Sequence, residues 1–185
     1  MEMIGKFRTF GGKIIIPHEY AYYFFKKLKK AGKTIDQETL EESIFNLEKT
    51  FEEEKDYLIE VFLDSGGDVF IDKKQLFKPN SDQLKAGEKL NDLNQKCVFW
   101  FKRDGYLYYV EDNLTDLLAI YILRILQEKI AICPIDSEKA IEMLENAEEA
   151  FYVDSEKGII SLFEVNGVAM GNSRFYANYL RNYLE

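Results

Sequence analysis

The chain has 185 residues, of which 46% are hydrophobic and 31% are charged, and its formal net charge is -9. A chain of this length and composition buries a core without needing disulfides or a metal, and it is not intrinsically disordered. Its acidity disfavours nucleic acid and anionic lipid as partners of the chain as a whole.

Hairpins and helices alternate along the chain. Turn residues and alternating apolar residues predict β-hairpins at residues 3–16, 57–71, 97–110 and 151–165. Apolar residues at helical spacing predict helices at residues 18–31, 34–55, 81–93, 114–130, 137–148 and 172–184. We therefore predict an α+β fold, with an antiparallel sheet built from successive hairpins, each followed by one or two helices that pack on one face.

The length favours a single domain over residues 1–185, with a subdivision near residues 72–81 as the alternative. The N-terminal residues lack the apolar run of a signal peptide, and the longest apolar stretch, residues 117–123, is too short to cross a bilayer, which takes about 20 residues. We expect a cytoplasmic protein with no membrane partner.

Motifs for catalysis, metals and phosphates are missing. Neither GxGxxG, GxxxxGK[ST] nor GxSxG occurs, and His18 is the only histidine. The sequence therefore predicts no catalytic residue, no metal site and no cofactor. Arg174, near the start of the terminal helix, is the residue to test if an anionic ligand binds there.

Charge is distributed unevenly. Residues 36–72 hold thirteen acidic residues and only two lysines, whereas residues 1–35 hold eight basic residues and two acidic ones. This pattern favours a non-enzymatic interaction module, such as an acidic inhibitor or immunity-type protein that binds a basic protein. The residues predicted to bind that partner are Glu38, Glu41, Glu42, Glu48, Glu52, Glu53, Asp64 and Asp68.

The overall outline resembles bacterial immunity or phage inhibitor proteins, although no residue motif carries that resemblance. Two other functions remain open. The chain could be an enzyme or small-ligand-binding protein whose site uses carboxylates and tyrosines in no standard pattern. It could also contact nucleic acid through the basic N-terminal hairpin and helix, at Lys26, Lys27, Lys29 and Lys30.

Overall fold

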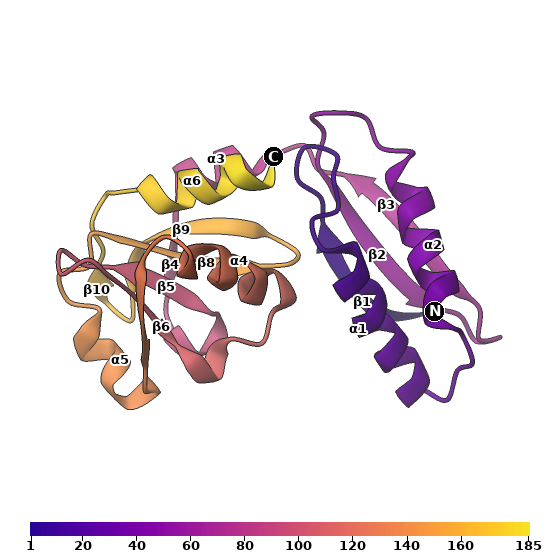
Figure 1. Cartoon of the computed structure of the whole chain (residues 1–185), viewed down its shortest axis with the longest axis horizontal. Helices are drawn as coiled ribbons and strands as arrows, with labels where there is room; N and C mark the ends of the chain where they lie inside the picture. The colour runs from indigo at the N-terminus through magenta and orange to yellow at the C-terminus, as the bar shows by residue number, and fades with distance from the viewer. The chain divides into compact units, whose positions relative to one another are not determined.

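The computed structural model describes residues 1–185 and divides into two compact units, whose elements are labelled in Figure 1. Unit 1 comprises Met1–Pro79 with Leu184–Glu185, and unit 2 comprises Asn80–Tyr183. The boundary falls within the stretch 72–81 at which the sequence suggested a subdivision. No helix in the structure is both long enough and apolar enough to span a membrane.

Unit 1 is a three-stranded antiparallel sheet with two helices. Its strand order is β1-β2-β3. The elements are β1 (Glu2–Arg8), α1 (Pro17–Lys30), α2 (Gln37–Glu48), β2 (Tyr57–Leu63) and β3 (Val69–Gln75).

The core of unit 1 forms where α1 packs on β1. Phe7 is fully buried and stacks on Tyr20 of α1 with ring centroids 4.2 Å apart. Phe24 lies so close to Gly5 that a Cβ there would come within 2.6 Å of the ring. Gly5 therefore lets the helix approach the strand closely.

A buried ion pair joins β1 to the start of β2. The Arg8 guanidinium donates to the Asp56 carboxylate, and the two side chains are only 1% and 7% exposed. The other Asp56 oxygen accepts the Gly11 N–H at 2.8 Å, and the Thr9 hydroxyl oxygen accepts the Tyr57 N–H at 2.8 Å. Burying two charges costs desolvation free energy, and the attraction between the two charges offsets that cost.

Unit 2 contains a seven-stranded sheet with order β10-β9-β8-β5-β6-β7, and β4 pairs with β9. Its strands are β4 (Glu88–Leu90), β5 (Val98–Phe101), β6 (Tyr106–Val110), β7 (Ala131–Ile135), β8 (Glu149–Asp154), β9 (Gly158–Val165) and β10 (Val168–Ala169). Its helices are α3 (Asn80–Ala86), η1 (Leu93–Gln95), η2 (Glu111–Asn113), α4 (Leu117–Gln127), α5 (Ser137–Met143) and α6 (Phe175–Leu184).

The predicted α+β class is confirmed, but the sheet of unit 2 is mixed rather than purely antiparallel. Strand β4 runs parallel to β9, and β7 runs parallel to β6. Neither β4 nor β7 was predicted. Three of the four predicted hairpins are present, as β2–β3, β5–β6 and β8–β9.

The first predicted hairpin is wrong. Strand β1 pairs with β2, which lies about 50 residues further along the chain, and the local pairing is limited to one bridge between Phe10 and Lys13. The turn itself is present, because Gly11 and Gly12 both adopt positive φ. The chain then enters α1 directly at Pro17.

Helices of unit 2 cover both faces of the sheet, in contrast to the predicted single face. On one face, Ala140 and Leu144 pack in a cluster with Trp100, Tyr108 and Tyr152. On the opposite face, Tyr176 of α6 stacks on Phe101 at 3.8 Å. Strand β8 is consequently buried at all six positions.

Most helices are shorter than predicted. Helix α2 ends at Glu48 rather than near residue 55, and α3 ends before Gly87, which has a φ of +66°. Helix α4 is capped by Asp116 and begins at Leu117 rather than at residue 114.

Removing one partner of the buried ion pair tests its role. Because Asp56→Ala removes the carboxylate that faces the buried Arg8 guanidinium, we expect it to lower the free energy of unfolding by about 3–5 kcal/mol. Urea unfolding followed by circular dichroism measures this. Lys55→Ala removes the neighbouring exposed ion pair with Glu52 and should leave the midpoint unchanged. Equal effects of the two changes would contradict the assignment.

Candidate functional site

Three loops of unit 2 surround an open hollow of about 580 Å³. They are the β5–β6 turn, the loop from α5 to β8, and the loop from β10 to α6. The residues that line the hollow are Lys102, Arg103, Asp104, Asn146, Ala147, Glu148 and Gly171. Its volume lies within the range of small-molecule sites, roughly 300–1,000 Å³.

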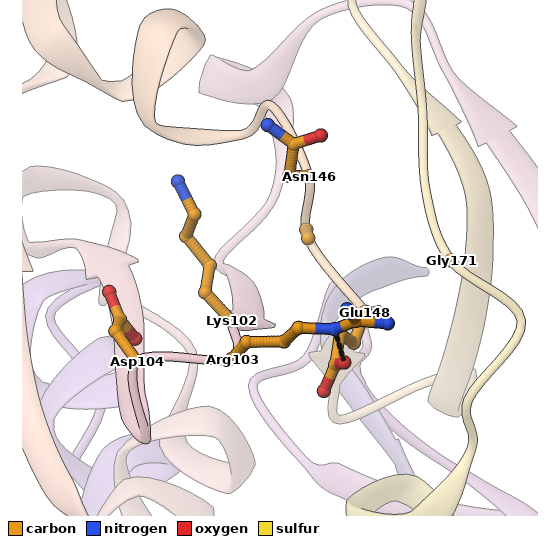
Figure 2. Close-up of a pocket in the computed structure, with 7 residues that line it drawn as sticks. Lys102, Arg103, Asp104, Asn146, Glu148 and Gly171 are labelled. Atoms are coloured by element: carbon orange, nitrogen blue, oxygen red, sulfur yellow. Dashed lines mark hydrogen bonds and ion pairs between the residues drawn. The ribbon is translucent and has the colours of Figure 1, made fainter.

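Charged groups of both signs face this hollow, as Figure 2 shows. The Lys102 side chain extends into the space between Asp104 and Asn146. Arg103 extends the other way, and its Nε donates to Glu148 Oε1 at 2.8 Å. The hollow therefore presents an amine and a carboxylate that are not bonded to each other.

Close backbone contacts shape the hollow. A Cβ on Gly171 would lie 2.3 Å from the Glu148 carbonyl oxygen, so only glycine fits there without a shift. The Gly171 N–H donates to the Ala147 oxygen at 2.8 Å, and the Glu148 N–H donates to the Phe101 oxygen at 2.8 Å. Asn146 has a φ of 61°, a conformation that asparagine tolerates better than most residues.

A carboxylate and a tyrosine are paired at the rim of the hollow. The Tyr108 hydroxyl donates to the Asp104 carboxylate, and the Tyr106 N–H donates to its other oxygen at 3.1 Å. The bond from Tyr108 is the main cause that lowers the pKa of Asp104. The same bond raises the pKa of Tyr108 to about 12. At neutral pH, Asp104 is thus an anion and Tyr108 a neutral phenol.

A second hollow, of about 480 Å³, lies in unit 1 between α2 and β3. Its lining side chains are aliphatic, hydroxyl or amide groups, among them Leu40, Ser43, Asn46 and Ile71. The hollow in unit 1 has no titratable group in its lining. The hollow at Lys102 and Asp104 is therefore the better candidate for chemistry.

Asp116 is held at the N-terminus of α4 by donors from two elements. Its Oδ1 accepts the N–H groups of Leu118 and Ala119 at 2.8 and 3.1 Å and the Ser155 hydroxyl at 3.1 Å. Its Oδ2 accepts the Ser155 N–H at 2.9 Å. Burial raises the pKa of Asp116, and the bonds from Ser155 and Ala119 act in the opposite direction. The carboxylate ties α4 to the β8–β9 turn.

Glu149 plays the corresponding part at α6. It is 2% exposed, and it accepts the N–H groups of Ala177 and Tyr176 at 2.8 and 3.1 Å and the Ser173 hydroxyl at 3.3 Å. Burial raises the pKa of Glu149. Both long helices of unit 2 therefore begin at a carboxylate of the chain.

The acidic residues predicted to bind a partner all lie in unit 1. Glu38, Glu42, Glu52, Glu53 and Asp68 are exposed. The other three are half-buried and already bonded within the chain. Glu48 accepts the Ile14 N–H at 2.7 Å, Glu41 accepts from Gln37 at 2.8 Å, and Asp64 accepts from Gly67 at 2.7 Å. Partner binding stays a prediction for these residues.

The predicted basic patch lies on α1, where Lys26, Lys27, Lys29 and Lys30 are exposed. Lys27 donates to the Ile4 carbonyl at 2.8 Å and lies over the Tyr23 ring. Arg174 is half-buried, and its guanidinium donates to the Lys85 carbonyl. The predicted anion site at Arg174 therefore has its cation bonded to the backbone, and anion binding there stays a prediction.

Sequence reasoning missed the residues of the hollow. Residues 103–105 were read only as a turn, and nothing in the sequence joined them to residues 146–148 or to Gly171, because the three loops are far apart along the chain. The alternation of residues 106–110 carried the one usable signal, since it places Tyr106 and Tyr108 on the same side of β6 beside Asp104.

No family model matches this chain, and no curated protein matches it in sequence. The fold, however, matches solved structures over nearly the whole chain. An aminotransferase from Brucella abortus bound to PLP aligns with a TM-score of 0.66 and 12% identity, covering 96% of this chain and 86% of that one. Branched-chain aminotransferases from Thermoproteus uzoniensis, solved with norvaline, and from Escherichia coli align with TM-scores of 0.64, at 12% and 11% identity. In both, 96% of this chain and 82% of the other are covered.

The chain thus has the fold of the class IV PLP-dependent aminotransferases. This likeness overturns the predicted non-enzymatic inhibitor or immunity-type protein, because nearly the whole of this chain has the fold of solved aminotransferases. The acidic segment 36–72 misled the prediction, since much of it forms α2 and β2 of unit 1. At 11–12% identity the similarity establishes the fold alone, so the function has to be inferred from the residues of the site.

The pairing of Asp104 with Tyr108 can be tested by titration. In Tyr108→Phe the carboxylate loses its main hydrogen bond, so we expect the pKa of Asp104 to rise toward its ordinary value. Carbon-detected NMR of the Asp104 carboxyl measures this. Tyr106→Phe, which removes an exposed hydroxyl two residues away, should leave the pKa of Asp104 unchanged. An unchanged pKa in Tyr108→Phe would refute the pairing.

Proposed function

We propose that this protein binds a small molecule, as an enzyme or ligand-binding protein, in the hollow lined by Lys102 and Asp104. The observation that carries the proposal is the fold, which is shared over 96% of the chain with aminotransferases, enzymes that act on small molecules. This function is the carboxylate-and-tyrosine alternative that the sequence left open.

The charges of the hollow favour a ligand that carries both signs. Lys102 supplies a cation for a ligand carboxylate, and Asp104 supplies an anion for a ligand ammonium group. Because the Tyr108 hydroxyl keeps the pKa of Asp104 low, the carboxylate is available over the whole neutral range. A free amino acid has the required pair of groups, and one of the similar enzymes was solved with norvaline.

The Arg103–Glu148 pair bounds the hollow on one side. The Arg103 side chain is 91% exposed, so the pair is screened by water and adds little stability of its own. A ligand carboxylate could displace Glu148 from Arg103 at small cost. The proposal involves no step through PLP.

A thermal-shift panel of amino acids, 2-oxo acids and nucleotides tests the proposal. A ligand at about 100 times its Kd should stabilise the fold by about 2.7 kcal/mol. We expect amino acids to raise the melting temperature of the wild type, and Lys102→Ala to abolish the rise. Lys139→Ala, an exposed lysine on α5, serves as the matched control and should retain it. A flat panel, or equal loss in both variants, would overturn the proposal.

A further inference from the structure

We infer that this chain does not carry PLP as its cofactor, although its fold is that of PLP-dependent enzymes. PLP chemistry requires a lysine that forms a Schiff base with the cofactor aldehyde, and donors that hold the cofactor phosphate. The residues of the chain can be compared with each requirement. The inference stands apart from the proposed ligand in the hollow.

The lysines do not fit the first requirement. A Schiff-base lysine reacts as the neutral amine, which a protein obtains by desolvating the lysine or by placing it beside other cations. No lysine of the chain is buried. In unit 2, Lys89 pairs with Glu164 and Lys96 pairs with Asp154 at 2.6 Å, so both amines are already held by carboxylates of the chain.

Lys102 is the lysine that most resembles a candidate, since it is half-buried and extends into a hollow. That hollow is open, and Asp104 lies beside it as a carboxylate. Lys102 is therefore not enclosed in an apolar pocket, as a Schiff-base lysine would be. Arg103, the nearest cation along the chain, extends away from Lys102 toward Glu148.

The helix N-termini do not fit the second requirement. The four donors that converge at the start of α4 hold the Asp116 carboxylate, and those at the start of α6 hold Glu149. In unit 1, α2 is capped by Asp36, and α1 begins with Pro17, which has no N–H, and has Glu19 in its first turn. A phosphate at any of these positions would meet a carboxylate of the chain.

Asp116 is the informative case, because its donors come from two elements rather than from one helix. Two backbone N–H groups of α4 and the N–H and hydroxyl of Ser155 surround one carboxylate. Such a set of donors would suit a phosphate if the carboxylate were removed. The structure thus assigns to the Asp116 carboxylate the place among these donors that a bound anion would otherwise take.

The first arm of the experiment uses the wild-type chain. It is incubated with PLP, reduced with borohydride, digested and mapped by mass spectrometry. We expect weak labelling spread over exposed lysines, with no lysine labelled at one PLP per chain, and no rise of the melting temperature with pyridoxamine 5'-phosphate. Labelling of Lys102 or any other single lysine at one per chain, blocked by excess pyridoxamine 5'-phosphate, would overturn the inference.

The second arm tests the role of Asp116. Asp116→Ser removes the carboxylate and leaves the four donors, so we expect inorganic phosphate to raise the melting temperature of this variant but not of the wild type. Asp136→Ser is the matched control: Asp136 caps α5 through the Glu138 N–H alone, and its variant should not respond. A cooperatively melting Asp116→Ser chain that ignores phosphate, or responds no more than the control, would refute the role of Asp116. If Asp116→Ser does not fold, the labelling of the wild type decides.

Discussion

The Asp116 carboxylate is the contact on which much of unit 2 depends, because it joins the most apolar helix to the central strands. It caps the N-terminus of α4 and also accepts hydrogen bonds from Ser155 in the β8–β9 turn. The Glu149 carboxylate at the other end of β8 does the same for α6. A helix is therefore tied by a carboxylate near each end of this strand.

The sequence predicted correctly those strand pairs whose two strands are neighbours along the chain. The hairpins β2–β3, β5–β6 and β8–β9 follow from alternating residues around turn signals. Long-range pairing was not predictable in this way. Strands β4 and β7 are short, and each joins its partner in parallel, which depends on strands distant in sequence. The apparent hairpin at residues 3–16 failed because β1 finds a longer partner in β2.

The function was harder to predict than the fold, for a related reason. An excess of acidic residues can be counted from a sequence, but the bonds that those residues make cannot. In the structure, Glu48 and Asp64 accept hydrogen bonds from backbone N–H groups of their own unit. The residues of the hollow, by contrast, come from three separate loops and include no recognisable motif. Some carboxylates of this chain hold parts of the fold together, and others line the hollow. Charge counted along a chain cannot separate the two uses.

The two edge strands of the seven-stranded sheet offer few backbone groups with which a strand of another chain could pair. One edge is β7, five residues long, whose fourth residue is the exposed Pro134, and the other is β10, only two residues long. Proline offers no N–H to an approaching chain, and two residues offer few partners. In a crowded cell, unit 2 should therefore resist being recruited into fibrils or swapped dimers through its sheet, even though its interior is rich in β-forming aromatic residues.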